Sequence, residues 1–236
     1  MNYDEWHEQL NVDQDADAPW HQLVRTHLVP ERDLAGRRVL EIGCGRGGFS
    51  LWLASRPIRP RHLVSVDFSP TAIRKGRAAA RGVGLEGITW EVGDIQAIAH
   101  PDDCFDTVIS CETIEHVRDP PRAIRELSRV LRPGGRLFLT APNYLGIYGI
   151  YRAYLRLAGR PFTEEGQPIN QFTLLPLTRT WVFRAGLKSV IVDGSGHYLL
   201  WPGRIPSRIH SFDRLRLLTR WLGLHSLVVA EKRTTC

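Results

Sequence analysis

Strand-like and helix-like segments alternate along this chain, and the alternation restricts the possible folds more than any other feature of the sequence. The apolar segments that read as strands are residues 38–43, 62–67, 88–93, 106–111 and 136–141, followed later by 187–193 and 225–231. Such an order is typical of a mostly parallel sheet with helices on both faces. We therefore expect an α/β fold with a sheet of about seven strands.

The segments between the strands carry local helix and turn signals. Ser69 precedes a proline and predicts a capped helix that runs to Arg81. Asp119, which also precedes a proline, predicts the next helix in the same way. The apolar stripe of that helix is Ile124, Leu127 and Leu131. A Pro-Gly-Gly sequence at 133–135 predicts a turn into the fifth strand.

Composition places the chain among ordinary globular proteins. It has 236 residues, of which 43% are hydrophobic and 24% charged, enough for one well-buried domain. The net charge of +6 is spread without a long basic run, which fits a solvated surface, permits an anionic partner and argues against nucleic acid. The cysteines form no C-x-x-C pair, and we see no signal peptide or long apolar span, so we expect a cytoplasmic protein.

A glycine-rich turn follows the first strand. Its glycines, which fit G-x-G-x-x-G, are Gly43, Gly45 and Gly48. This pattern lets the backbone and the next helix approach an anionic ligand such as a dinucleotide. Glu41 before the turn disfavours a pyrophosphate and favours a ligand with ammonium and sulfonium groups. Asp67 ends the second strand, where an acid can bind ribose hydroxyls, and Asp94 follows the third, where it can accept from an adenine amino group.

Consecutive motifs now identify a family resemblance. The segments "VLEIGCGRG", "VSVDFS", "WEVGDI", "FDTVISCETIEHVRDP" and "LRPGGRLFLTAPN" resemble, in order, the motifs of class I S-adenosylmethionine-dependent methyltransferases. The resemblance covers roughly residues 36–143. It implies a Rossmann-like sheet whose last strand is antiparallel to its neighbours. The cofactor-binding residues it implies are Glu41, Gly43, Cys44, Gly45, Asp67, Phe68, Asp94, Ile95 and Cys111.

The resemblance also implies a role for most of these residues. Glu41 and the turn glycines face the methionine part of S-adenosylmethionine, and the backbone of Cys111 meets its ammonium group. Asp67 holds the ribose. Phe68 packs on the adenine, and residues 94–95 border the adenine edge.

The candidates for catalysis lie in "CETIEHV". Glu112, Glu115 and His116 are spaced i, i+3, i+4, so on a helix they share one face at the end of the fourth strand. Two carboxylates and an imidazole can bind a divalent metal such as Mg²⁺, which would activate an acceptor hydroxyl. Without metal, His116 can act as a general base. The third interpretation is structural, with acids at a helix start and a packed histidine.

The E-x-x-E-H-V phrase resembles O-methyltransferases of ubiquinone biosynthesis and metal-dependent methyltransferases of small-RNA ends. Both groups typically carry a further histidine after the fifth strand, whereas this chain has Gln167, Asn170 and Gln171 before Phe172. This difference disfavours a tight zinc site and remains compatible with Mg²⁺. Gln167 and Asn170 are instead expected to hydrogen-bond the substrate.

Aromatic residues mark two segments expected to cover the site. The first, near the start of the chain, contains Tyr3, Trp6 and Trp20, which close over the cofactor or pack against the sheet. The second carries Tyr144, Tyr148, Tyr151 and Leu155 at helical spacing, and of these Tyr144 and Tyr148 are predicted to contact substrate. Residues 206–221 predict another basic amphipathic helix. We expect a small helical lid, with peripheral membrane contact as the alternative.

We expect a single methyltransferase domain over residues 1–236. Its parts are an N-terminal lid at 1–35, a cofactor-binding core at 36–142, a substrate-covering insertion at 143–215, and the last helix end with the final strand at 216–236.

The sequence favours transfer of a methyl group from S-adenosylmethionine to a hydroxyl of a phenolic, sugar or lipid-linked small molecule. The alternatives are methylation of an RNA 2′-hydroxyl, binding of S-adenosylmethionine without catalysis, and a dehydrogenase. The sequence leaves the acceptor and the oligomeric state open.

Overall fold

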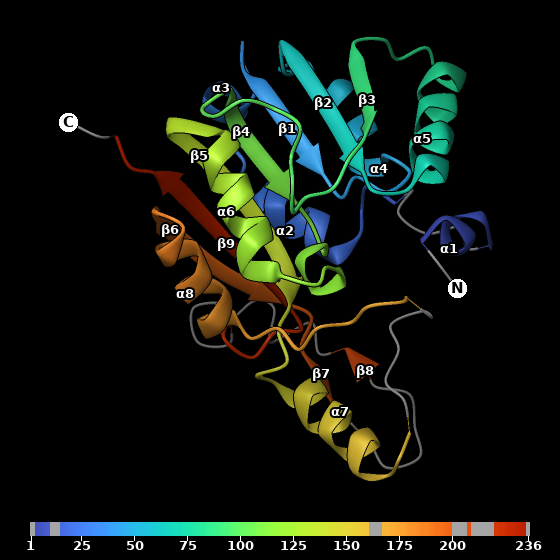
Figure 1. Cartoon of the computed structure of the whole chain (residues 1–236), viewed down its shortest axis with the longest axis vertical. Coiled ribbons are helices and arrows are strands. Elements are labelled where there is room, and N and C mark those ends of the chain that lie inside the picture. Colours follow the sequence, from blue (N-terminus) through green and yellow to red (C-terminus); the bar gives the residue numbers. More distant parts are fainter. Residues whose placement is uncertain (1–2, 10–14, 161–166, 200–206, 209–219, 235–236) are drawn as a thin grey trace.

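The computed structural model describes residues 3–9, 15–160, 167–199, 207–208 and 220–234. Its centre is a seven-stranded sheet in the order β3-β2-β1-β4-β5-β9-β6 (Figure 1). The strands are β1 (Arg38–Ile42), β2 (His62–Asp67), β3 (Ile88–Val92), β4 (Phe105–Ser110), β5 (Leu131–Pro142), β6 (Leu187–Ser195) and β9 (His225–Lys232). The predicted α/β fold and all the predicted strands are confirmed.

Strand directions agree with the family resemblance. β3, β2, β1, β4 and β5 pair in parallel, whereas β9 is antiparallel to both β5 and β6. The expected antiparallel last strand is therefore confirmed. Because the parallel strands run the same way, their carboxyl ends meet at one edge of the sheet, where α/β proteins bind ligands.

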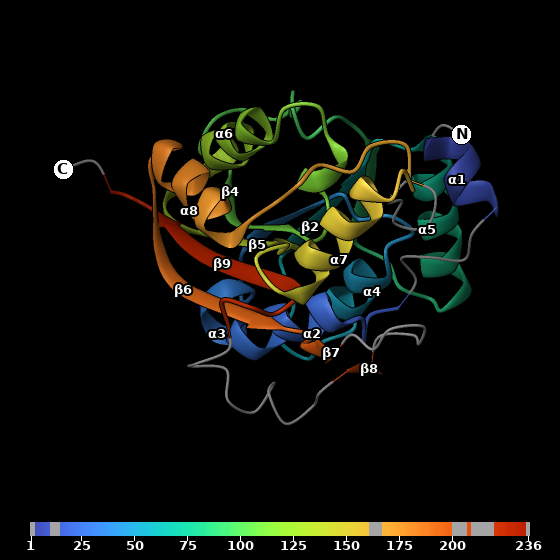
Figure 2. The same cartoon turned by 90° about the horizontal axis from the view of Figure 1, so that it is seen from below.

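Helices cover both faces of the sheet (Figure 2). They are α1 (Tyr3–Gln9), α2 (Pro19–His27), α3 (Pro30–Asp33), α4 (Gly48–Ala54), α5 (Pro70–Gly82), α6 (Pro120–Val130), α7 (Ile147–Leu157) and α8 (Leu175–Arg184), with a short 3₁₀ helix, η1 (Ile114–His116). Side chains of α6 and α8 pack on one face of the sheet and those of α2 and α4 on the other. Figure 1 shows α7 extending away from the carboxyl ends of the strands.

Alternate residues of the central strands supply the two halves of the core. Leu40 of β1 and Val108 of β4 belong to the cluster under α6, whereas Val39 and Ile109 belong to the cluster under α2 and α4. A strand buried on both faces reads as a continuous apolar run. This explains why the strands were predictable.

The predicted helix starts are also confirmed. The side chain of Ser69 accepts a hydrogen bond from the backbone N–H of Ala72 at the start of α5. The side chain of Asp119 accepts one from Arg122 at the start of α6. A side-chain oxygen in this position satisfies an N–H group that has no partner inside the helix.

Two expectations about local structure need correction. β5 begins at Leu131, so residues 133–135 lie within the strand, where its pairing with β4 shifts register. Of the predicted helix at 206–221, Ser207–Arg208 instead form strand β8, paired with β7 (Tyr198–Leu199). Residues 206 and 209–219 of that prediction lie outside the described residues.

The predicted insertion at 143–215 also needs revision. Side chains of α8 pack in the core, and β6 is a strand of the main sheet, so the covering role is left to residues before α8. No helix in the described part of the chain has the length and apolarity needed to cross a bilayer. The cytoplasmic location remains a prediction.

A buried ion pair joins α3 to β5. Arg136 Nη1 donates to both carboxylate oxygens of Asp33, at 3.0 and 2.7 Å. The side chains of Arg136 and Asp33 are 5% and 1% exposed. Asp33 also accepts a hydrogen bond from the backbone N–H of Val29, 2.7 Å away, at the start of the helix.

We expect Asp33→Ala to lower the free energy of unfolding by about 3–5 kcal/mol, because it leaves the buried guanidinium with only the more distant carboxylate of Glu231, 3.8 Å from its Nε atom. The control is Asp17→Ala, which removes an exposed pair with Arg25 and should cost less than about 1 kcal/mol. Urea unfolding of both variants measures the difference. Similar small losses in the two variants would contradict the assigned role of the Asp33–Arg136 pair.

Candidate active site

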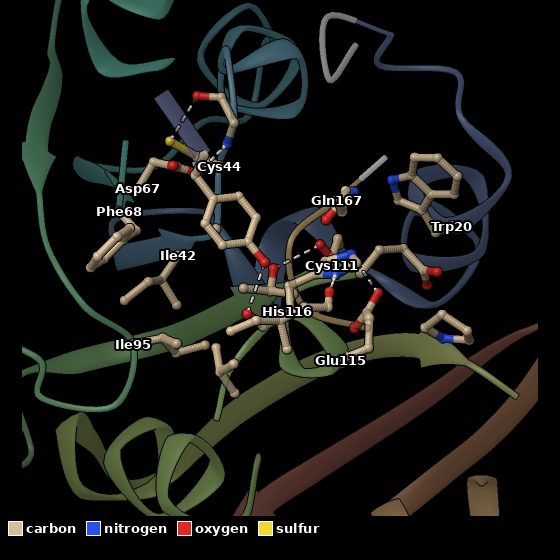
Figure 3. A pocket seen from close by; sticks show the side chains of 18 of the residues that line it. Trp20, Ile42, Cys44, Asp67, Phe68, Ile95, Cys111, Glu115, His116 and Gln167 are labelled. Atoms are coloured by element: carbon tan, nitrogen blue, oxygen red, sulfur yellow. Dashed lines mark hydrogen bonds and ion pairs between the residues drawn. The ribbon is translucent and has the colours of Figure 1, made fainter. Parts of the chain in front are cut away.

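A cavity of about 1080 Å³ opens at the carboxyl ends of the central strands (Figure 3). Its wall combines the glycine turn after β1, the ends of β2, β3 and β4, the N-terminal helices and residues 167–169. In Figure 3, Phe68 and Ile95 lie toward one side of the cavity and Trp20 toward the other, with Glu115 and His116 between them. Segments that are distant in sequence therefore meet in one hollow.

The glycine turn has a backbone that ordinary residues rarely adopt. Gly43, Gly45 and Gly47 have φ values of 76°, 52° and 77°. A Cβ atom at Gly43 would lie 2.1 Å from the Oγ1 atom of Thr113, so a side chain there would collide with the segment after β4. Glycine is required both for the left-handed conformation and for this close approach.

Asp67 fixes the conformation of the turn. Its Oδ2 atom accepts a hydrogen bond from the backbone N–H of Gly45 at 2.8 Å, and its Oδ1 atom accepts one from Ser69 at 2.9 Å. Burial raises the pKa of Asp67, and these hydrogen bonds oppose that shift by stabilising the charged form.

Most of the predicted cofactor-binding residues line this single cavity. They are Gly43, Cys44, Gly45, Asp67, Phe68, Asp94, Ile95 and Cys111. The side chain of Phe68 is 63% exposed, so its ring is available to pack on a planar ligand, and Ile95 is buried. The roles of the individual residues remain predictions.

Glu41 is the exception, because it does not line the cavity. Its carboxyl group is buried beneath the turn and accepts a hydrogen bond from the hydroxyl of Ser50. Burial raises the pKa of Glu41 from 4.5 to about 8. A carboxyl group in this state is mostly neutral at pH 7 and is a poor partner for an ammonium group.

The raised pKa of Glu41 predicts a specific pH dependence of stability. The unfolded chain loses this proton near pH 4.5 and the folded chain only near pH 8, so the contribution of Glu41 to stability falls as the pH rises between these values. We expect Glu41→Gln to reduce that fall, whereas the exposed control Glu86→Gln should not. Chemical denaturation at pH 5 and pH 8 measures the effect, and equal pH dependence of wild type and Glu41→Gln would disprove it.

The predicted helical face of Glu112, Glu115 and His116 is wrong. Only Ile114–His116 form a helix, the short η1, and Glu112 precedes it with a φ of 45°. This left-handed backbone sends the carboxylate of Glu112 toward β9, where its Oε2 atom lies 3.4 Å from Nδ1 of His225. Glu115 is fully buried and lies 3.6 Å from Nε2 of His116. The two acids of the motif therefore contact different imidazoles, although the charge of Glu112 also favours the protonated form of His116.

The predicted metal set is not assembled. Within the described ranges of the chain, no three His, Cys, Asp or Glu side chains are grouped so that they could hold a metal ion. The left-handed backbone at Glu112 interrupts the helical spacing, and the carboxylate of Glu112 lies beside His225 while that of Glu115 lies beside His116. The residues present do not fit a metal centre.

His116 has a defined orientation. Its Nδ1 atom lies 2.8 Å from the carbonyl oxygen of Ile169. A carbonyl can only accept, so Nδ1 carries the hydrogen and Nε2 of the neutral ring carries the lone pair. Burial lowers the pKa of His116 below its usual 6.5. The ring is therefore a neutral base at physiological pH.

The predicted substrate residues divide into two groups. Tyr148 and Gln167 line the cavity. Tyr144 does not: it is buried and stacks on Phe172, with a ring separation of 5.1 Å. Asn170 also lies outside the wall, where its Oδ1 atom accepts a hydrogen bond from Arg152 at 3.3 Å. Tyr144 and Asn170 hold the lid segment in place.

The N-terminal aromatic residues do cover the cavity. Tyr3, Trp6 and Trp20 all line it, and the hydroxyl of Tyr3 donates to the carbonyl oxygen of His116 at 3.0 Å. Sequence reasoning missed His21 and His225, which also line the cavity. Neither lies in a recognisable motif. The position of His225 at the start of a predicted strand was the only signal available.

The order of this sheet, its single antiparallel strand and the glycine turn secured by an acid at the end of β2 define the class I methyltransferase fold. The sequence profile of the methyltransferase domain family matches residues 40–139. Residues 40–139 thus match a methyltransferase domain, and the described sheet has the fold of S-adenosylmethionine-dependent methyltransferases.

Similar proteins agree with this assignment. Methyltransferase GfsG of Streptomyces halstedii is 31% identical over 139 residues, 58% of this chain and 49% of that protein. A ubiquinone biosynthesis O-methyltransferase of Xanthomonas oryzae pv. oryzae is 37% identical over 139 residues, 55% of each chain. The chain therefore spans about half the length of these curated relatives. The crystal structure of an S-adenosylmethionine-dependent methyltransferase from Mesorhizobium loti has a TM-score of 0.64 at 19% identity, covers 92% of this chain and 99% of its own, and shows the shared fold.

Proposed function

We propose that this protein transfers a methyl group from S-adenosylmethionine to a hydroxyl oxygen of a small molecule, with His116 as the general base. The domain family supports the donor. The similarity to a ubiquinone biosynthesis O-methyltransferase supports an oxygen acceptor. The cavity volume of about 1080 Å³ is at the upper end of the range for small-molecule sites, which fits a donor and an acceptor bound together.

The cavity residues fit the donor. The carboxylate of Asp67 has about four lone-pair sites. It accepts hydrogen bonds from the backbone N–H groups of Gly45, Ser69 and Phe68 and keeps capacity for a ribose hydroxyl. Phe68 and Ile95 offer apolar surface for the adenine. S-adenosylmethionine, when bound, supplies an electron-poor methyl carbon on a sulfonium sulfur.

The observation that carries the proposal is the orientation of His116. With Nδ1 donating to the carbonyl of Ile169, Nε2 is the basic nitrogen of the ring and can take the proton of an acceptor hydroxyl. The buried carboxylate of Glu115, 3.6 Å from Nε2, would stabilise the imidazolium that results. Tyr148 and Gln167, which line the same cavity, would orient the acceptor beside this base. No step requires a metal.

The acceptor class includes lipid-linked molecules because of the outer surface of α7. Ile150, Tyr154 and Leu157 are 69%, 60% and 89% exposed. Their i, i+4, i+7 spacing places them on one side of the helix. An apolar surface beside the cavity fits an acceptor with an apolar tail.

Transfer of a labelled methyl group to a panel of phenols, sugars and prenylated phenols tests the proposed reaction. We expect product with at least one hydroxylated acceptor and none with its O-blocked analogue. Binding of S-adenosylhomocysteine without transfer to any acceptor would instead support the non-catalytic alternative. Labelling of both the acceptor and its blocked analogue would place the methyl group on another atom.

His116 should determine the acid limb of the pH–rate profile. Because burial lowers the pKa of His116 below 6.5, kcat/KM should rise with pH through the acidic range and be constant at neutral pH. We expect His116→Asn to lower kcat by about 10²–10⁴-fold with little change in KM and to remove this limb. The exposed control His62→Asn should retain wild-type rates. An unchanged acid limb in His116→Asn would assign the base to another group.

A further inference from the structure

The carboxylate of Glu112 is the cavity feature that the proposed reaction leaves unused. Glu112 lines the cavity between Cys111 and Thr113, and its side chain is 14% exposed. Its Oε1 atom is buried and has no hydrogen-bond partner among the described residues. A buried carboxylate oxygen without a donor is unfavourable, so this oxygen fits a ligand that brings one.

The surrounding structure holds this carboxylate in place. The backbone N–H of Glu112 donates to the carbonyl oxygen of Thr140 at 3.2 Å and lies 3.1 Å from its Oγ1 atom. These contacts fix the left-handed backbone at Glu112. On the opposite side, Nδ1 of His225 lies 3.4 Å from Oε2 of Glu112. The ring centroids of His225 and Trp20 are 5.3 Å apart.

Glu112 lies next to residues that are expected to contact the methionine end of S-adenosylmethionine. The resemblance places the ammonium group at the backbone of Cys111, which directly precedes Glu112. Thr113, the next residue, lies so close to Gly43 that a Cβ atom there would collide with it. Glu112 is therefore flanked by residues that contact the glycine turn or are expected to contact the ammonium group.

Other carboxyl groups are less suited to this ammonium. Glu41, the acid that the family resemblance implies, lies off the cavity wall and is mostly protonated at neutral pH. Asp67 holds the turn, and Asp94 accepts hydrogen bonds from the backbone and side chain of Gln96. Glu115 lies beside His116.

We propose that the carboxylate of Glu112 binds the α-ammonium group of S-adenosylmethionine, with His225 as the positioning residue that fixes the carboxylate. This inference rests on the proposed function, because it requires that donor. It assigns to Glu112 a role in donor binding, beside the effect of its charge on His116.

Two ligands that differ in the amino-acid arm test the proposal. S-adenosylhomocysteine carries the ammonium group, whereas 5′-methylthioadenosine keeps the nucleoside and sulfur but lacks the arm. We expect Glu112→Gln to lower the affinity for S-adenosylhomocysteine, measured by calorimetry, by about 10- to 100-fold. This is the loss typical of a charge-assisted hydrogen bond. Its affinity for 5′-methylthioadenosine should stay within about twofold of wild type.

The matched control is Glu115→Gln, which makes the same chemical change in the same cavity and should leave the ratio of the two affinities unchanged. His225→Phe keeps an aromatic ring but loses the N–H group that donates to Glu112. It should lower the ratio of the affinity for S-adenosylhomocysteine to that for 5′-methylthioadenosine by about 3- to 10-fold. Thermal unfolding of each variant verifies that it is folded.

If Glu112→Gln lowers the affinity for both ligands equally, or for neither, the proposed role of Glu112 is overturned while the proposed function is left intact. Failure of the wild-type protein to bind either ligand would overturn the proposed function itself.

Discussion

The carboxylate of Asp67 connects the parts of the molecule on which the cavity depends. It ends β2, and its oxygens accept hydrogen bonds from the turn between β1 and α4 and from the start of α5. Neighbouring parallel strands bring these segments to the same edge of the sheet, but they do not by themselves fix the backbone of the turn. Asp67 does so with a charged acceptor, which makes stronger hydrogen bonds than a neutral one.

Much of the fold could be predicted from the sequence because its signals are local. The central strands are buried on both faces, so each reads as a continuous apolar run. Ser69 and Asp119 cap helices through contacts that span only a few residues. The antiparallel β9 has no such local signal. Its direction was available only through the family resemblance, and the register of its pairing with β5 and β6 confirms it.

The candidate site was less predictable because it depends on tertiary contacts. The spacing of Glu112, Glu115 and His116 predicts a shared face only if the backbone is helical, and the hydrogen bonds from Glu112 to Thr140 replace the helix with a left-handed residue. A non-glycine residue in this conformation is uncommon and is found where surrounding contacts enforce it. His225 approaches Glu112 from a strand near the other end of the chain. No pattern within either segment indicates that they meet.

Glu41 and Glu112 differ in how they would act on the positive charges of the donor. The donor has positive charge on its sulfonium and ammonium groups, and the sulfonium charge disappears as the methyl group leaves. An anion that stabilises the sulfonium alone would favour the bound donor over the transition state and would slow transfer. Burial keeps Glu41, under the glycine turn, mostly neutral at pH 7. Glu112 instead lies beside Cys111, where it can bind a charge that transfer does not change, so its contribution would strengthen donor binding without opposing the chemical step.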